Sequence, residues 1–305
     1  MPNWTDVLHE LRTTPSPFDT VRRKYLKKIN GHTNRNVIAY YSGWLQKQPL
    51  AAQGVTFALD EVDKSGFMTA IYGLDRSLGL DLILHTPGGS ITALEGLVTY
   101  LRSMFGRDVR AIVPQIAMSA GTMLALTCKE IILGKHSSLG PIDPQLGGMP
   151  AHGVIEEVRR AQTEIATTPV LAHFWMPILG KYPPTLIGGA EKAIKLAETL
   201  VTQWLETGMY ATEPDATAKA QVVVNWLGQL SNTLAHDRRV SIDEARSHGI
   251  KVIRLEDDAV LQDLVLSAHH AYITTLSETQ ATRIIENHDG IAHIQNVQMV
   301  ATRVG

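Results

Sequence analysis

Two short stretches, HTPGGS at residues 85–90 and QIAMSAG at residues 115–121, contain residue types that acyl transfer requires. This chemistry needs a nucleophilic hydroxyl group, a base that takes its proton, and N–H donors directed at the developing oxyanion. Ser119 offers the hydroxyl group, and Gly88 and Gly89 let the backbone approach a substrate closely because they carry no Cβ atom. Ser119 also fits an ordinary helix cap, since a helical pattern follows it. Each motif alone is common, and the two together are more specific.

The elements around these stretches alternate between strand and helix from residue 36 to residue 134. Such alternation with short connections predicts a parallel sheet with crossover helices. Ligands of these sheets bind at the carboxyl ends of the strands, which is where both motifs lie. Apolar runs and apolar spacings of three and four define the individual elements. The predicted strands span 36–44, 80–89, 109–117, 130–134 and 137–143, and the predicted helices span 67–78, 90–105 and 119–128.

The second half of the chain is more helical. Helices are predicted at 153–166 and 241–250, and a strong amphipathic helix follows the Pro- and Gly-rich stretch at 177–189. Alternating runs around Asp-Gly predict a β-hairpin at 282–297. We divide the chain into an N-terminal helical segment (1–30), a main α/β domain (31–255), and a C-terminal helix and hairpin (256–305), in which the hairpin is a candidate oligomer contact.

The composition excludes several classes of protein. Of the 305 residues, 44% are hydrophobic and 19% are charged, which is typical of a soluble globular protein. A net charge of −2 gives no overall attraction to nucleic acid. The single cysteine, Cys128, lies in an apolar run, which predicts a buried, inert thiol in a reducing compartment. No apolar run has the length of a signal or a membrane span, so we expect a cytoplasmic location and no membrane association.

Three stretches, LILHTPGGS (82–90), IVPQIAMSAGTML (112–124) and SSLGPIDPQLGG (137–148), resemble the ClpP/crotonase-fold serine proteases. Within that fold, the chain is most similar to the signal peptide peptidase A-like (SppA-like) branch, and in it to the serine dehydrogenase proteinase (SDH) family. VRRKYLKKI, NVIAYYSGWLQ, GFMTAIYGLDRS and GKYPPT also resemble that family. The resemblance covers most of the chain, from residue 4 to residue 270. It implies a ClpP/crotonase-like α/β fold with a mostly parallel sheet, crossover helices and a helical C-terminal extension.

The resemblance also implies roles for residues of the two motifs. Ser119 matches the nucleophile of ClpP-like proteases. The N–H groups of Gly89 and Ala120 match the oxyanion hole, and Gly88 shapes the turn.

The base is where this sequence departs from ClpP. Asp143, in GPIDPQLGG, stands where ClpP has its histidine, so a ClpP-type Ser-His-Asp triad is not expected. Asp143 either holds a turn that shapes the substrate groove or orients the base. The SppA-like branch uses a Ser-Lys dyad, and Lys181 in GKYPPT fits the place of that lysine. A lysine acts as a base if burial lowers its pKa, which the apolar stretch before Lys181 would provide. His136 is expected to be structural, His236 is a further candidate, and His85 is expected to be a core histidine with satisfied hydrogen bonds.

We therefore expect an ATP-independent serine endopeptidase that acts on peptides or unfolded protein segments, with no cofactor and no metal. The resemblance implies a homo-oligomer whose active sites face an enclosed or cleft-like space, with the peptide bound as an added strand. Two alternatives stay open. One is a crotonase-type enzyme, in which the oxyanion hole polarises an acyl-CoA thioester, and the other is a proteolytically inactive scaffold with the ClpP fold.

Overall fold

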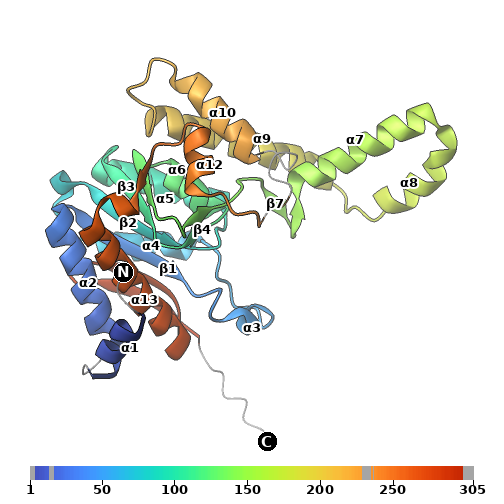
Figure 1. The fold of residues 1–305 in the computed structure, drawn as a ribbon. Coiled ribbons are helices and arrows are strands. Elements are labelled where there is room, and N and C mark those ends of the chain that lie inside the picture. The colour runs from blue at the N-terminus through green and yellow to red at the C-terminus, as the bar shows by residue number, and fades with distance from the viewer. Residues whose placement is uncertain (1–3, 14–16, 229–234, 236, 298–305) are drawn as a thin grey trace, which may run out of the picture.

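The computed structural model describes residues 4–13, 17–228, 235 and 237–297, and in these residues a seven-stranded sheet forms the centre of the fold (Figure 1). Its strands span Asn36–Ser42 (β1), Leu80–His85 (β2), Val109–Val113 (β3), Glu130–Leu133 (β5), Val252–Arg254 (β9), Ala281–Asn287 (β10) and Ala292–Asn296 (β11). The spatial order is β11-β10-β1-β2-β3-β5-β9. The strands from β1 to β9 are parallel, β10 is antiparallel to β1, and β11 is antiparallel to β10. The predicted α/β class with a mostly parallel sheet and crossover helices is confirmed.

Helices cover both faces of the sheet, and each face has its own apolar core. One face packs against α4 (Glu61–Ile71), α5 (Ile91–Phe105), α6 (Ala120–Leu126), α9 (Leu186–Thr207) and α10 (Ala216–Gly228). The other face packs against α2 (Pro17–Thr33) and α13 (Ala259–Glu278). The remaining helices are α1 (Trp4–Thr13), α3 (Gln48–Ala51), α7 (Ala151–Thr167), α8 (Ala172–Leu179) and α12 (Ile242–Ser247), with 3-10 turns at Arg76–Leu78, Pro169–Leu171 and Leu255–Asp257.

The helix predicted at 67–78 begins and ends earlier than expected. Asp60 and Asp63 form a capping box, in which each side chain accepts a hydrogen bond from the backbone of the other. This box fixes the start of α4 at Glu61, and the chain leaves the helix after Ile71. The capping signal therefore outweighs the apolar spacing on which the prediction relied.

The strand predicted at 109–117 is divided in two. Pro114, which has no N–H group to donate, separates β3 from β4 (Ile116–Ala117). β4 leaves the main sheet and pairs with β6 (Ser138–Leu139). β6 is shorter than the strand predicted at 137–143, of which only these two residues are in strand conformation. A further small pair joins β7 (Gln145–Leu146) and β8 (Met149–Pro150).

The C-terminal segment is continuous with the main sheet. β10 is buried at every position and lies between β1 and β11, so the sheet extends across the boundary that we placed after residue 255. α13 shares its apolar core with α2. Of the two hairpin strands, β11 is the partly exposed one at the sheet edge. An oligomer contact by the hairpin stays a prediction.

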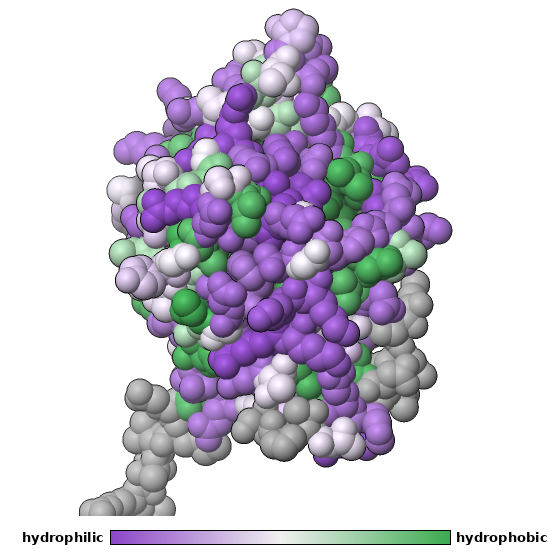
Figure 2. All heavy atoms as spheres, turned by 90° about the vertical axis from the view of Figure 1, so that its left-hand side faces the viewer, coloured by the Kyte–Doolittle hydropathy of each residue, from purple (hydrophilic) through white to green (hydrophobic). Residues whose placement is uncertain are grey.

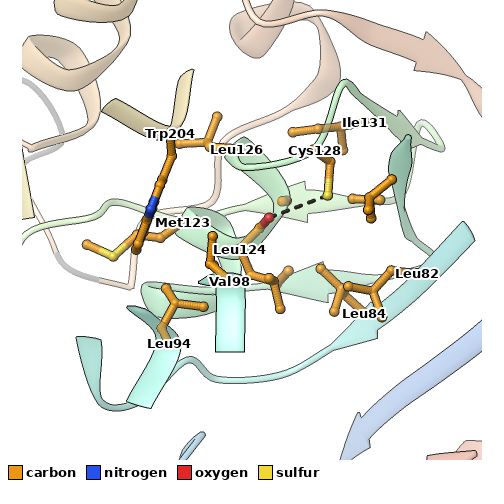
Figure 3. Packing of buried hydrophobic residues seen from close by; sticks show 14 of the residues in the cluster. Leu82, Leu84, Leu94, Val98, Met123, Leu124, Leu126, Cys128, Ile131 and Trp204 are labelled. Carbon is orange, nitrogen blue, oxygen red and sulfur yellow. Dashed lines mark hydrogen bonds between the residues drawn. The ribbon is translucent and has the colours of Figure 1, made fainter. Parts of the chain in front are cut away.

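Cys128 lies in the apolar core on the α6 face of the sheet (Figure 3). It is surrounded by aliphatic side chains, and its Sγ lies 3.5 Å from the carbonyl oxygen of Leu124. Burial raises the pKa of this thiol to about 12. The nucleophilic thiolate is therefore suppressed at neutral pH, and the predicted buried, inert thiol is confirmed.

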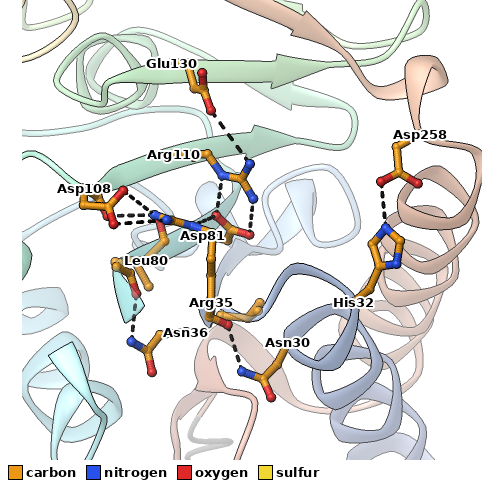
Figure 4. Close-up of polar contacts among 12 residues, drawn as sticks. Asn30, His32, Arg35, Asn36, Leu80, Asp81, Asp108, Arg110, Glu130 and Asp258 are labelled. Carbon is orange, nitrogen blue, oxygen red and sulfur yellow. Dashed lines mark hydrogen bonds and ion pairs between the residues drawn. The ribbon is translucent and has the colours of Figure 1, made fainter. Parts of the chain in front are cut away.

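Charged side chains fix the amino ends of the strands (Figure 4). Asp81, buried in β2, accepts hydrogen bonds at 2.7 Å from Nε of both Arg35 and Arg110. The Arg35 guanidinium also contacts Asp108, just before β3. Such charge-assisted hydrogen bonds are the stronger kind. They hold β1, β2 and β3 together at the edge opposite the two sequence motifs.

α7 and α8 project from the body of the molecule as an arm (Figure 1). α8 falls in an apolar stretch for which no helix was predicted. Its Trp175 is buried and donates a hydrogen bond to Glu164 of α7, whereas Val170, Phe174 and Met176 are 59–68% exposed. Within the described part of the chain, no helix has the length and apolar character needed to cross a membrane.

The face at the left of Figure 1 differs from this arm. Its described residues are mainly hydrophilic, with apolar side chains in small, separate groups (Figure 2). Scattered apolar residues of this kind are ordinary on protein surfaces.

Histidines and aromatic rings gather at the carboxyl end of β2, on the α13 face. His85 is fully buried, with its ring centroid 4.6 Å from that of Trp44 and 5.2 Å from that of His269. Neither ring nitrogen of His85 has a hydrogen-bond partner among the described residues, so the predicted satisfied core histidine is buried but unsatisfied. Burial lowers the pKa of His85 from 6.5 to about 3.

This lowered pKa predicts a loss of stability in acid. The unfolded chain binds a proton at His85 as the pH falls through 6.5, whereas the folded chain does so only near pH 3. The stability that depends on a neutral ring is therefore present above pH 6.5 and is lost as the pH falls through this window. We expect protonation at His85 to lower the unfolding free energy of the wild type by about 2 kcal/mol between pH 7 and pH 5. The unfolding free energy of His85→Leu should not show this decrease.

Denaturant unfolding at the two pH values measures this difference. His9→Leu, which removes an exposed histidine of α1, is the control and should keep the wild-type pH dependence. Equal pH dependence of His85→Leu and the wild type would contradict the prediction.

Candidate active site

The loops that follow β2, β3 and β5 meet at the carboxyl edge of the sheet. Thr86 forms a parallel bridge with Ala117, and the pairing of β4 with β6 joins Ala117 to Leu139. The Thr86 N–H donates to the carbonyl of Ile116 at 3.2 Å, and the Met118 N–H donates to the carbonyl of Thr86 at 3.0 Å. This second layer of backbone pairing brings HTPGGS and QIAMSAG side by side.

Ser119 has a strained backbone and does not cap the helix that follows it. It stands at the N-cap position of α6 with φ +50° and ψ −120°, and its side chain makes no capping hydrogen bond. A capping serine has extended backbone angles and accepts from the helix backbone, as Ser90 does from the N–H of Ala93 at 3.3 Å. The ordinary-cap interpretation of Ser119 is therefore wrong. Non-glycine residues hold such angles at a cost of about 1–3 kcal/mol, mostly at functional sites.

Gly88 lies against Ser119. A Cβ atom built at Gly88 would lie 2.7 Å from the Cβ of Ser119 and 2.8 Å from the backbone N of Ala120. The backbone of Gly88 has φ +96°, and its N–H donates to Oγ1 of Thr86 at 3.1 Å. Only glycine allows this approach, so the structure brings the turn and the serine of the two motifs into direct contact.

The N–H groups of Gly89 and Ala120 are both available at this site. Leu59 bonds to the carbonyl of Gly88 and to the N–H of Ser90, so the N–H of Gly89, between them, points away from Leu59. Ala120 is the first residue of α6, where an N–H has no partner within the helix. Among the described residues, neither amide has an acceptor. Two free amides beside a half-buried serine are what an oxyanion hole requires.

The predicted base, Lys181, lies in the loop between α8 and α9 and is exposed. The expected burial of Lys181 is therefore absent in the single chain. Neither its ammonium group nor the Ser119 hydroxyl has a hydrogen-bond partner among the described residues, so the dyad stays a prediction. His136 is exposed in the β5–β6 turn, with its ring over Gly134.

Asp143 lies beyond β6 and is fully buried. Its Oδ2 accepts a hydrogen bond from Nε2 of Gln145 at 2.9 Å, and it has a further interaction. Burial together with the hydrogen bond from Gln145 of the same loop fits the predicted turn-holding role, and the alternative of orienting a base also stays open. His236 lies outside the described residues.

Leu59 also belongs to this site, although no sequence pattern indicated it. A single bridge inside a loop leaves no periodic pattern, and its partner Gly89 is recognisable only as a turn glycine. In the described ranges, no group of three or more His, Cys, Asp or Glu side chains is placed to hold a metal ion. The arrangement is suited to attack on a carbonyl group by a serine.

Comparisons with known proteins identify relatives of the chain. A family model described as "ClpP-like SDH-type serine proteinase" matches residues 16–266. The chain is 28% identical over 234 residues to "Uncharacterized protein MJ0137" of Methanocaldococcus jannaschii. The aligned region covers 76% of this chain and 73% of that relative. It is also 30% identical over 190 residues to "Uncharacterized protein MJ1495" of the same organism. That aligned region covers 62% of this chain and 57% of that relative.

The strained backbone at Ser119 predicts an unusual response to glycine. Glycine adopts positive φ freely, so Ser119→Gly should relieve strain of about 1–3 kcal/mol, partly offset by roughly 0.5–1 kcal/mol of extra chain entropy. We expect Ser119→Gly to be about 1 kcal/mol more stable than Ser119→Ala in chemical denaturation.

Glu95, exposed in the middle of α5, supplies the control. There the order reverses, and Glu95→Gly should be about 1 kcal/mol less stable than Glu95→Ala. The same order at position 119 as at position 95 would show that the Ser119 backbone is unstrained.

Proposed function

Because the chain belongs to the family of ClpP-like SDH-type serine proteinases, we propose that it is an ATP-independent serine endopeptidase that cleaves peptides or unfolded protein segments. The observation that carries this proposal is the geometry of Ser119, whose strained backbone and uncapped side chain lie against the Gly88 turn. Backbone strain of this kind in a non-glycine residue is concentrated at active sites and ligand-binding sites.

In the proposed reaction, Oγ of Ser119 attacks the scissile carbonyl carbon and its proton passes to the base. The N–H groups of Gly89 and Ala120 donate to the oxyanion as the tetrahedral intermediate forms. Removal of one such donor costs about 10²–10³ in kcat in other serine proteases. The base then protonates the leaving amine. In the second half of the reaction the base takes a proton from water, which attacks the acyl-enzyme to form a second tetrahedral intermediate, and this proton returns to Oγ of Ser119 as the carboxylic acid product leaves.

We assign the role of base to Lys181. An exposed ammonium group is a poor base, because desolvation is what lowers the pKa of a lysine. The assignment therefore requires that the arm be covered when the protein is active. The exposed apolar residues Val170, Phe174 and Met176 support this requirement, since an assembly that buries them would also desolvate the neighbouring loop. The proposed active form is accordingly a homo-oligomer.

The exposure of Lys181 also favours one alternative, a proteolytically inactive scaffold that retains the fold. In such a protein Ser119 would have no base and would react with neither peptides nor activated electrophiles. The two functions therefore differ in a directly measurable reactivity.

A fluorophosphonate probe tests the nucleophile. We expect it to label the wild type, and we expect Ser119→Ala to abolish labelling because the attacking hydroxyl is gone. Ser90→Ala removes the helix-capping hydroxyl in the adjacent motif and should still be labelled. Absence of labelling in the folded wild type would favour the scaffold.

Lys181→Met tests the base. It removes the amine and keeps the length of the side chain, so kcat on an unfolded casein-type substrate should fall by about 10²–10⁴-fold, the usual contribution of a general base. Lys192→Met removes an exposed lysine of the following helix, α9, and should keep the wild-type kcat. Hydrolysis by Lys181→Met at the wild-type rate would assign the base elsewhere.

A further inference from the structure

The segment 56–60 lies directly on the glycine turn of the site. The N–H of Leu59 donates to the carbonyl of Gly88 at 2.7 Å, and the carbonyl of Leu59 accepts from the N–H of Ser90 at 2.9 Å. The fit is tight, because a Cβ atom at Gly89 would lie 2.3 Å from the backbone N of Leu59. The position of the Leu59 backbone therefore determines where the N–H of Gly89 points.

Buried polar groups of the sheet hold this segment in turn. Arg283 of β10 donates from Nη2 to the carbonyl of Ala58 at 2.6 Å and from Nη1 to Oδ1 of Asp63 at 2.8 Å. The side chains of Arg283 and Asp63 are 1% and 0% exposed. Ser42, the register partner of Arg283 in β1, donates to the carbonyl of Phe57 at 2.8 Å. Neighbouring positions of β1 and β10 thus hold consecutive carbonyls of one loop.

We propose that the buried Arg283–Asp63 pair positions the oxyanion hole, by fixing Ala58 and, through Leu59, the turn at Gly88 and Gly89. This inference rests on the proposed function, because it concerns how the same amide is aimed. The guanidinium group donates along fixed directions in one plane, so Arg283 ties the loop carbonyl rigidly to the α4 carboxylate. An oxyanion donor is effective when it is already aimed at the place where charge develops, which requires such support.

A second buried ion pair on the same strand supplies a matched control. Glu286 accepts from Nε of Arg22 at 2.9 Å and from the hydroxyl of Tyr272 at 2.9 Å, and both charged side chains are 0% exposed. Residues three apart on a strand face opposite sides, so Glu286 faces α2 and α13 while Arg283 faces α4. Within the described ranges, Glu286 makes no hydrogen bond to the segment 56–60. Its loss should weaken the fold without moving the turn.

The experiment compares Asp63→Asn, Ser42→Ala and Glu286→Gln with the wild type. Hydrogen exchange is measured by mass spectrometry over residues 56–60 and 86–90, alongside kcat and KM on a peptide substrate and the rate of fluorophosphonate labelling. We expect Asp63→Asn to exchange faster at both segments and to lose about 10–100-fold in kcat with KM unchanged, because misaimed donors stabilise the transition state less. Ser42→Ala should show the same changes to a smaller extent, and Glu286→Gln should show neither.

The outcomes separate this inference from the proposed function. Unchanged exchange at 86–90 in Asp63→Asn would overturn the inference, as would faster exchange with an unchanged kcat and labelling rate. Ser42→Ala removes one neutral hydrogen bond, so it decides the question if Asp63→Asn fails to fold. If the wild type is not labelled at all, the proposed function fails, while the exchange data still show whether the pair holds the turn.

Discussion

The contact between the Gly88 backbone and the Ser119–Ala120 backbone is the constraint on which the site depends. A side chain at position 88 would collide with both residues, so the turn and the first residue of α6 approach only through glycine. The approach also explains the unusual backbone of Ser119. The chain must turn sharply there to enter α6 while Thr86 and Ala117 remain paired, and positive φ achieves that turn. Strain at Ser119 and the absence of a Cβ atom at Gly88 are thus two consequences of one close packing.

The amino ends and the carboxyl ends of the parallel strands differ in the groups that join them. At the amino ends, charged side chains bind one another, with Asp81 buried between two arginines. At the carboxyl ends, backbone groups pair across three loops, and the amides of Gly89 and Ala120 have no acceptor in the part of the chain that the structure describes. An edge fixed by ion pairs holds the strands in register, and that register is what allows the opposite edge to present unsatisfied donors in a constant geometry.

The arm carries apolar side chains that the described part of the chain does not bury. α8 keeps Trp175 against α7, whereas Phe174 and Met176 of α8 and Val170 of the preceding 3-10 turn are exposed, and the loop that follows α8 carries Lys181. Burial of that surface would change the solvation of the loop as well as the stability of the arm. The proposed nucleophile and oxyanion donors come together within one chain, whereas the environment of the proposed base depends on what covers α8.

The sequence by itself determined the elements that are local. Apolar runs specified β1, β2 and the crossover helix α5, and the glycines and serine of HTPGGS and QIAMSAG marked both halves of the site, because these features depend on neighbouring residues. Tertiary structure alone decided the rest. The bridge from Leu59 to Gly89 and the hydrogen bond from Arg283 to Ala58 each join segments that are distant in the chain. Sequence periodicity does not indicate such contacts. A single hydrogen bond between remote loops fixes the positions of two groups in space but does not restrict the types of the neighbouring residues in the sequence.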